Sequence, residues 1–228
     1  AAPTGASEPD GALKGGDGFI ENEFLRATAR GALIELFDKE TGRLWPNLNL
    51  LEEEADAGDA WDFAPPWTPG SVIRSTAFNF ESRLTEMGGV RATLRIKGDL
   101  IVPEALHGDE RSRTDARVPV VFDISLTRGT RRADVKMTLV NTARDHRIRL
   151  RIPTGVKAET VLSQGHLAIL DRPVARQKEI EPWLQPPTQL LPCREWLAVR
   201  DGENRLAVAL KGLYAHEALP APHGGGID

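Results

Sequence analysis

The sequence predicts an all-β protein whose antiparallel hairpins pack as a β-sandwich. Three observations support this fold class. Apolar and polar residues alternate with a period of two in several segments, which is typical of strands with one buried face. Turn residues, above all glycine, separate these segments at short intervals. No window carries a helical apolar stripe over three turns, so consecutive hairpins are the expected architecture.

The predicted strands follow one another along the chain. Residues 19–45 form a first hairpin whose loop is Asp38 to Gly42, with glycine where a left-handed residue is needed. Later hairpins are centred on Gly88 and Gly89, on Gly129, and on Asp201 and Gly202. In the third hairpin the alternating apolar residues are Val118, Val120, Phe122, Ile124 and Leu126. Residues 146–155 alternate as well, with Ile148, Leu150 and Ile152 on one face and Arg147, Arg149 and Arg151 on the other.

Composition limits the classes of function. The 228 residues, 27% charged and 40% hydrophobic, suit one large domain or two small ones. The net charge is −4 and the basic and acidic residues are scattered along the chain, so no basic surface for binding nucleic acid is predicted. Cys193 is the only cysteine, which excludes an internal disulfide and a thiolate metal cluster and favours a cytoplasmic location. No apolar run approaches the roughly 20 residues of a membrane span, so no membrane partner is expected.

The domain boundaries are read from composition. Residues 1–18 are small, polar and glycine-rich, and we expect them to be a linker or disordered lead-in. Residues 19–228 are expected to form the folded β-sandwich domain. The chain begins without an initiator methionine and ends in LPAPHGGGID, from which we expect a piece of a longer protein.

The stretch DAGDAWDFAPP, residues 56–66, is the first candidate site. Its aspartates, Asp56, Asp59 and Asp62, could place carboxylates around one small molecule for acid/base chemistry or calcium binding. The alternative is that they accept hydrogen bonds from their own backbone in an irregular loop. Trp61 and Phe63 favour contact with a sugar ring, and the alternative for them is burial under the prolines that follow.

The remaining candidates are a histidine–aspartate pair and the arginines. His107 and Asp109 have the His-x-Asp form of metal hydrolases, but they lie in a charged, solvated connection, and we predict no metal there. Arg172 and Arg176 suit a pair of sugar hydroxyls or a carboxylate, or else form a solvated pair at the sandwich edge. The arginine stripe of residues 147–151 is interpreted as an ordinary solvent-facing surface.

Taken in order, the motifs resemble a known family. They are IENEFLRA, FDKETGRLW, LNLLEEEADAGDAWDFAPP, HRIRLRIPTGVKAETVLSQG, LDRPVARQ and PPTQLLPCREWLAVRDGENRLAVALKGL. This set, from about Phe19 to about Glu217, resembles the C-terminal β-domain of glycoside hydrolase family 38, the α-mannosidases, and within it the bacterial branch with mannosylglycerate hydrolases. The specificity lies in the ordered set, not in any one motif.

The resemblance implies a supersandwich domain similar to galactose mutarotase. It also implies a retaining, exo-acting α-mannosidase whose catalytic carboxylates and divalent metal ligands, usually for zinc, lie in an N-terminal catalytic domain. None of those motifs can be matched in this chain. We therefore expect no catalytic residue and no bound cofactor or metal here, and we expect the fragment alone to be inactive.

The resemblance also implies which residues of this chain approach the sugar. By position within the motifs these are Trp61, where the family commonly has tyrosine, and Arg172, with Arg176 as second choice. Asp59 and Asp62 are then expected to shape the loop or bind sugar hydroxyls. The partners implied are a mannoside or oligosaccharide substrate and the catalytic domain of the same chain. A stand-alone carbohydrate-binding module and a structural module that packs on a partner domain are the alternatives.

Overall fold

The structure is a computed structural model that describes residues 13–59, 63–68, 70–175, 190–202, 204–219 and 226–227. The chain divides into two compact units, residues 1–150 and 151–228, and each is described by itself. Across the described residues the regular structure is β-strand apart from one 3-10 turn, Ser75–Ala77. The sheets are antiparallel, which confirms the predicted all-β class.

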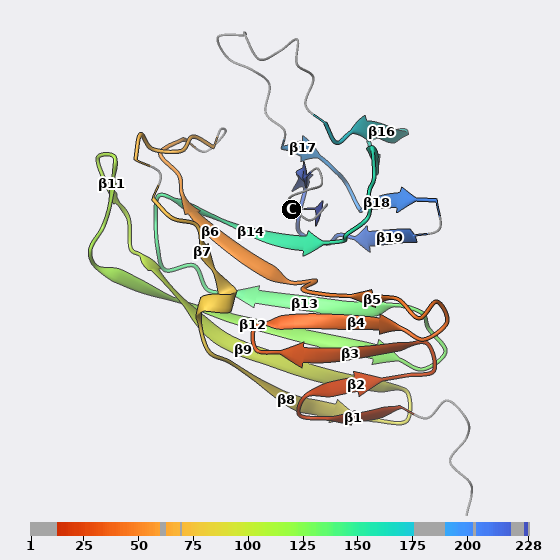
Figure 1. Ribbon diagram of the computed structural model, residues 1–228. Helices are drawn as coiled ribbons and strands as arrows, with labels where there is room; N and C mark the ends of the chain where they lie inside the picture. Colours follow the sequence, from red (N-terminus) through yellow and green to blue (C-terminus); the bar gives the residue numbers. More distant parts are fainter. Residues whose placement is uncertain are drawn as a thin grey trace, which may run out of the picture. The chain divides into compact units, whose positions relative to one another are not determined.

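Unit 1 contains two main sheets (Figure 1). The first has the order β1-β2-β3-β4-β5, and its strands are β1 (Lys14–Gly16), β2 (Phe19–Glu21), β3 (Leu25–Arg30), β4 (Leu33–Asp38) and β5 (Leu44–Trp45). The second has the order β13-β12-β9-β8, and its strands are β8 (Phe80–Met87), β9 (Arg91–Pro103), β12 (Asp115–Thr127) and β13 (Ala133–Leu139). Figure 1 shows them as two layers.

The core of unit 1 lies between these two sheets. One side comes from the first sheet, with Ile20, Ala27 and Ile34, and the other from the second sheet. The predicted alternating residues of β12 all belong to this core, each no more than 1% exposed: Val118, Val120, Phe122, Ile124 and Leu126. Two antiparallel sheets that bury their facing side chains form a β-sandwich, as the period-two pattern predicts.

A buried asparagine ties the two layers together. Asn22, 1% exposed, donates from Nδ2 to the carbonyls of Thr127 and Thr130, both at 2.8 Å. Its Oδ1 accepts hydrogen bonds from the backbone N–H groups of Phe24 and Leu25. The amide therefore has a partner on both sides, as a buried polar group requires. It fastens the start of β3 to the turn that follows β12.

The predicted hairpins are confirmed. The turn between β4 and β5 has Gly42 at φ 69°, the left-handed conformation that glycine adopts without strain. The turns at 88–89 and near 129 join β8 to β9 and β12 to β13. The start of the fold differs from expectation, because β1 lies inside the stretch predicted as a linker. Its residues pair with β2, which gives their backbone groups partners.

A pair of short strands, a single strand and a hairpin position the candidate site. Strand β6 (Leu50–Ala55) pairs with β7 (Ile73–Arg74), and β14 (His146–Pro153) neighbours β6 on its other side. The remaining element is a small hairpin, in which β10 (Leu106–His107) pairs with β11 (Glu110–Arg111). The connection from β6 to β7, residues 56–72, is called the site loop below.

Unit 2 is also antiparallel. Its main sheet has the order β16-β15-β18-β19, and its strands are β15 (Thr160–Gln164), β16 (Ile169–Pro173), β18 (Trp196–Asp201) and β19 (Asn204–Ala209). The short pairs are β17 (Leu191–Pro192) with β20 (Ala215–His216) and β21 (Ala218–Leu219) with β22 (Gly226–Ile227). The hairpin from β18 to β19, predicted from Asp201 and Gly202, is confirmed.

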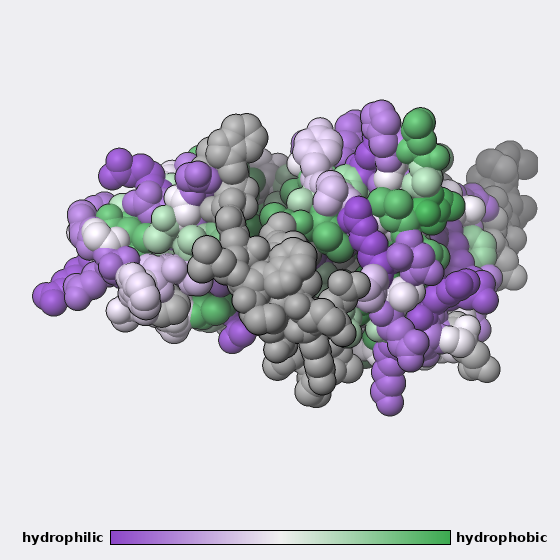
Figure 2. All heavy atoms as spheres, turned by 90° about the horizontal axis from the view of Figure 1, so that it is seen from above, coloured by the Kyte–Doolittle hydropathy of each residue, from purple (hydrophilic) through white to green (hydrophobic). Residues whose placement is uncertain are grey.

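The surface mixes polar and apolar residues, as Figure 2 shows for the face that it presents. Among the described residues, the most exposed large hydrophobic side chains are Leu167 at 96%, Trp67 at 92% and Tyr214 at 73%. Single exposed apolar residues are normal on protein surfaces, but a tryptophan exposed to this degree invites a functional explanation. In the described part of the chain, no helix has the length and apolar character that a bilayer crossing needs.

Candidate functional site

The site loop leaves β6 through a turn built on Asp56. The Oδ1 atom of Asp56 accepts hydrogen bonds from the backbone N–H of Gly58 at 2.9 Å and of Ala64 at 3.1 Å. The Ala57 N–H donates to the Ala64 carbonyl at 2.7 Å. This is the self-bonded aspartate turn that was the alternative to a catalytic or calcium-binding role. The carboxylate of Asp56 therefore holds Ala64 close to the start of the loop.

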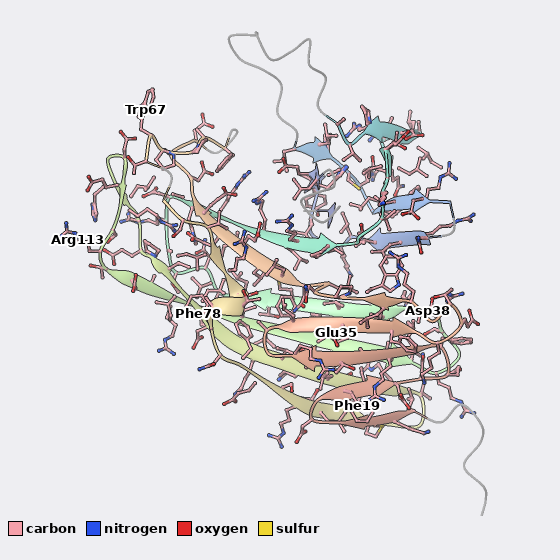
Figure 3. The ribbon with its side chains drawn as sticks, viewed as in Figure 1. Phe19, Glu35, Asp38, Trp67, Phe78 and Arg113 are labelled. Atoms are coloured by element: carbon pink, nitrogen blue, oxygen red, sulfur yellow. The ribbon has the colours of Figure 1, made fainter. Side chains whose placement is uncertain are left out.

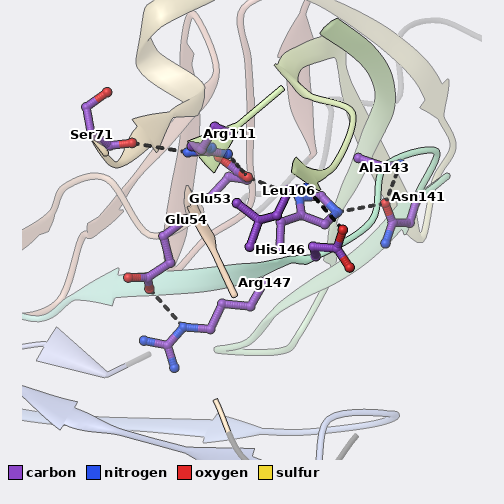
Figure 4. Close-up of polar contacts among 10 residues, drawn as sticks. Glu53, Glu54, Ser71, Leu106, Arg111, Asn141, Ala143, His146 and Arg147 are labelled. Carbon is purple, nitrogen blue, oxygen red and sulfur yellow. Dashed lines mark hydrogen bonds and ion pairs between the residues drawn. The ribbon is translucent and has the colours of Figure 1, made fainter. Parts of the chain in front are cut away.

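Beneath the loop lies a polar cluster, called the buried cluster below, in which the side chains of Glu53, Arg111 and His146 are largely buried and Asn141 is exposed (Figure 4). Glu53 is fully buried, and its Oε1 accepts a hydrogen bond from Arg111 Nη2. The same oxygen lies 3.1 Å from His146 Nδ1, and His146 Nε2 lies 3.0 Å from Asn141 Oδ1. Since Asn141 Oδ1 also accepts the Ala143 N–H, it faces His146 as an acceptor. The His146 ring thus lies between two oxygen acceptors.

The electrostatics explain why a carboxylate survives in this position. Burial alone would raise the pKa of Glu53, because it disfavours the charged form. The hydrogen bond with His146 and the hydrogen bond and positive charge of Arg111 outweigh burial and lower the pKa of Glu53 below 4.5. Glu53 is therefore ionised at neutral pH and holds its partners by charge-assisted hydrogen bonds.

The glutamates on either side of Glu53 also pair with arginines. Glu52 contacts Arg74 at 2.8 Å and Arg149 at 3.5 Å, and Glu54 contacts Arg147 at 2.8 Å and Arg149 at 3.1 Å. The side chains of Arg147 and Arg149 are only 23% and 19% exposed. The interpretation of this arginine stripe as an ordinary solvent-facing surface was wrong. Neighbouring β6 supplies carboxylates that the local sequence of β14 does not reveal.

Arg147 also reaches the site loop. Its guanidinium carbon lies 3.2 Å from the centre of the Phe63 ring, a cation–π contact, while its Nε donates to Glu54. Phe63 is partly buried in this arrangement. The loop is thus anchored by an aromatic contact in its middle and by the buried cluster at its base.

An open hollow adjoins the loop. Its volume is about 450 Å³, and its lining residues are Ala57, Pro65, Pro66, Trp67 and Asp109. Trp67 is 92% exposed, and Figure 3 shows it at the outer part of the loop, pointing away from the strands of unit 1. Asp109 comes from the exposed turn between β10 and β11, in agreement with the solvated position expected for His107 and Asp109. An indole, prolines and one carboxylate form a surface that a sugar ring can contact.

The structure places only some of the predicted site residues. Trp61, Asp62 and Arg176 lie outside the described residues. Asp59 is an exposed residue of the site loop in unit 1, and Arg172 lies on β16 in unit 2. Across the described ranges, no group of three or more His, Cys, Asp or Glu side chains is arranged to hold a metal ion.

Arg172 lies beside a buried histidine of the same unit. Its Nη1 donates to the carbonyl of Pro192 at 3.3 Å. Burial lowers the pKa of His216, which is 1% exposed, below its ordinary value of 6.5, and the positive charge of Arg172 lowers it further, against the opposing effect of the Leu191 backbone. His216 therefore stays neutral at neutral pH.

Three residues of the buried cluster were missed by sequence reasoning, namely Glu53, Arg111 and His146. Glu53 sits in a run of three acids that looks solvated, and its partners lie 58 and 93 positions away in sequence. The available signal was that apolar residues flank the glutamates in LNLLEEEA, so that a strand through this segment places Glu53 on the same face as Leu51 and Ala55. A strand that carries acids into the interior requires basic partners, but the local sequence does not say which.

Comparison with known proteins gives consistent results. The sequence family that matches residues 20–225 is described as the glycosyl hydrolases family 38 C-terminal domain. A protein of Halalkalibacterium halodurans, provisionally named a mannosylglycerate hydrolase, is 25% identical over 217 residues. That match covers 88% of this chain but 24% of the relative, so the chain spans about a quarter of the length of that protein.

Two solved structures share the fold. An α-mannosidase from Enterococcus faecalis V583 superposes with a TM-score of 0.84 at 21% identity, over 92% of this chain and 25% of that one. A glycosyl hydrolase family 38 protein from Enterococcus faecalis superposes with a TM-score of 0.83 at 23% identity, over 98% of this chain and 27% of that one. The architecture of the whole chain is therefore that of a domain found within larger proteins.

Proposed function

The chain belongs to glycoside hydrolase family 38 and corresponds to the C-terminal domain of its members. On that premise we propose that it lines the substrate mouth of an α-mannosidase. The catalytic part would be supplied by an N-terminal domain of the same protein, which hydrolyses terminal α-mannosides. The fragment alone would be inactive. The relative's name and the α-mannosidase among the structural neighbours support this assignment.

One observation carries the proposal for the site loop. The loop projects from β6 and β7, yet its base is held by the buried Glu53 and its middle by the contact of Arg147 with Phe63. A projecting loop with such anchorage can present the exposed Asp59 at a constant position. Constant positioning is what a substrate-binding wall contributes to catalysis, because it lowers the entropy cost of reaching the reactive geometry.

The chemistry itself would take place outside this chain. In a retaining mechanism a carboxylate attacks the anomeric carbon, the leaving-group oxygen takes a proton from an acid, and water then releases mannose with the same anomeric configuration. A divalent metal, usually zinc in the family, would belong to the catalytic domain and assist in binding the sugar. This chain would contribute binding energy and orientation and would take no part in proton transfer.

Each predicted residue has a stated role in this proposal. Trp61 would pack on the sugar ring, since it lacks the hydroxyl of the tyrosine common in the family. Arg172, with Arg176 as second choice, would donate paired hydrogen bonds to sugar hydroxyls or to a substrate carboxylate. Asp59 and Asp62 would shape the loop or accept hydrogen bonds from hydroxyls. We further propose a cytoplasmic protein whose partners are the mannoside and the catalytic domain.

The direct test compares the complete gene product with this chain alone. Both would be incubated with an aryl α-mannoside and with mannosylglycerate, and the first anomer released would be identified by proton NMR. We expect the complete product to release α-mannose and the isolated chain to release none. Release of β-mannose first, or hydrolysis by the isolated chain, would contradict the proposal.

The hollow beside Trp67 favours a second candidate function, a carbohydrate-binding module that acts on its own. An indole with 92% exposure beside the Asp109 carboxylate could hold a sugar without a catalytic domain. Isothermal titration of the isolated chain with methyl α-mannoside and with α-linked mannobiose tests this candidate. A heat of binding that is seen with the unmodified chain and disappears in Trp67→Ala would favour the module. If the unmodified chain gives no heat of binding, the role as a domain of a larger enzyme would be the better explanation.

A further inference from the structure

We propose that Arg111 is a positioning residue, which joins the two ends of the site loop and thereby fixes the position of the described part of that loop. No sugar contact is assigned to Arg111 itself. Its effect on the loop is a property of this chain alone, and its consequence for catalysis rests on the proposed function.

The strand pairing at the base of the loop is short. Only two residue pairs join β6 to β7, Glu52 with Arg74 and Glu53 with Ile73. Two residue pairs stabilise the closure of the 17-residue loop, residues 56–72, only weakly. Closing a loop of this length carries an entropy cost that few hydrogen bonds offset. An additional contact between the two ends of the loop is therefore valuable.

Arg111 supplies that contact from a third segment. Its Nη2 donates to Glu53, which precedes the loop, and its Nη1 donates to the Ser71 carbonyl at 3.3 Å, near the end of the loop (Figure 4). The side-chain stem of Arg111 also packs on Gly70, where an added Cβ would lie 3.2 Å from Arg111 Cδ. Gly70 has φ +70°, a conformation that L side chains rarely adopt. The two Nη atoms of one planar guanidinium thus link the two ends of the loop.

The position of Arg111 is itself fixed. In the β10–β11 hairpin it pairs with Leu106, whose N–H donates to Asp145 Oδ2 at 3.0 Å. The carbonyl of Asp145 accepts the N–H of Asp56, the first residue of the loop, at 2.9 Å. The hairpin and the start of the loop are therefore held by the same residue. Since the Arg111 side chain is only 13% exposed and Glu53 is buried, the fork has little freedom to leave its place.

A lysine at this position separates positioning from simple charge pairing. Lysine keeps the positive charge and can reach Glu53, so the buried carboxylate stays paired. It has no planar fork and cannot hold Glu53 and the Ser71 carbonyl together in the geometry of arginine. If Arg111 only neutralises Glu53, Arg111→Lys should behave like the wild type in every measurement. If Arg111 positions the loop, the lysine variant should remain folded with a looser loop.

The experiment is hydrogen–deuterium exchange of the 228-residue chain, read by mass spectrometry, with thermal unfolding of the same samples. The variants are Arg111→Lys and Arg111→Met, and the matched control is Arg113→Met, because Arg113 is exposed on the segment that follows β11. We expect Arg111→Lys to unfold at nearly the wild-type temperature while amides of the site loop exchange about tenfold faster, as for one lost charge-assisted hydrogen bond. Exchange of the β9 and β12 peptides should not change.

Unchanged loop exchange in Arg111→Lys would overturn the proposal, and so would an equal increase in Arg113→Met. Arg111→Met removes both contacts and should show the larger increase, but the lysine variant carries the test if the methionine variant does not fold.

A kinetic measurement on the complete gene product then tests the catalytic consequence. We expect Arg111→Lys to lower kcat/KM for an aryl α-mannoside about tenfold, mainly through KM, since misplaced binding groups weaken substrate contacts. Faster loop exchange in a product without mannosidase activity would refute the proposed function and leave the role of Arg111 standing. Normal activity with unchanged exchange would refute the role of Arg111 and leave the proposed function standing.

Discussion

Glu53 Oε1 lies 3.1 Å from His146 Nδ1, and the two side chains are 0% and 2% exposed. This pair joins β6 to β14 directly below the site loop, and Arg111 completes it from a third segment. A buried carboxylate is tolerated only where basic partners compensate for the loss of water. The contribution of this cluster to stability can be measured without any substrate.

Replacing Glu53 by glutamine should destabilise the chain. The amide keeps the shape of the side chain but loses the charge that holds Arg111 and His146, and we expect a loss of about 2 kcal/mol of unfolding free energy. The control is Glu35→Gln, which removes the exposed pair with Arg30 and should cost less than about 0.5 kcal/mol. Urea unfolding measures both. Equal losses of unfolding free energy in the two variants would show that the buried position of Glu53 adds nothing to the stability of the chain.

The contribution of Glu53 should depend on pH in a defined direction. The pKa of Glu53 in the folded chain lies below the ordinary 4.5, so the folded state stabilises the ionised carboxylate more than the unfolded state does. The stabilisation is therefore complete above pH 4.5 and is lost as pH falls through the folded pKa. The difference in unfolding free energy between wild type and Glu53→Gln should shrink over that range. A difference that grows on acidification would contradict the assignment.

Asn22 should be a stability determinant of the sandwich. Asn22→Ala removes two donated and two accepted hydrogen bonds from a residue that is 1% exposed, and it leaves buried backbone groups without partners. We expect a loss of about 3 kcal/mol. Asn204→Ala, which removes one side-chain contact with Asp201 at a β-turn, is the control and should cost much less. Comparable losses in thermal unfolding would show that Asn22 does not join the layers as described.

The charge of Arg172 should be visible in the titration of His216. Because the guanidinium opposes protonation of the buried imidazole, Arg172→Met should raise the pKa of His216 toward its ordinary value. An NMR titration of the histidine ring protons measures this shift. Arg205→Met, an exposed arginine on β19, serves as the control and should leave the titration unchanged. A downward or absent shift in Arg172→Met would contradict the described proximity.

The hairpins could be predicted from the sequence because their signals are local. The turn residues 38–42 lie between alternating segments, and β12 carries five apolar residues at a period of two, so a short window contains the whole pattern. The buried cluster could not be predicted in this way. Glu53 resembles a solvated acid, and the basic partners that bring it into the interior come from the β10–β11 hairpin and from β14.

The arginine stripe illustrates the same limit. Alternation in β14 correctly placed Arg147 and Arg149 on one face, but alternation alone does not say whether that face meets water or another strand. The neighbouring β6 turns it into an ion-pair surface with Glu52 and Glu54. For Trp61 and Arg172 the local sequence suggested contact with a sugar but left a structural alternative open, and the resemblance to the family favoured the sugar contact.

The central claim is that this domain lines the substrate mouth, and Trp61→Ala in the complete gene product tests it most directly. Steady-state kinetics with an aryl α-mannoside would be measured together with the thermal unfolding temperature. We predict at least about a tenfold fall in kcat/KM at an unchanged unfolding temperature, because the proposed role of Trp61 is to stack on the sugar. Unchanged kinetics in a folded, active enzyme would contradict the claim.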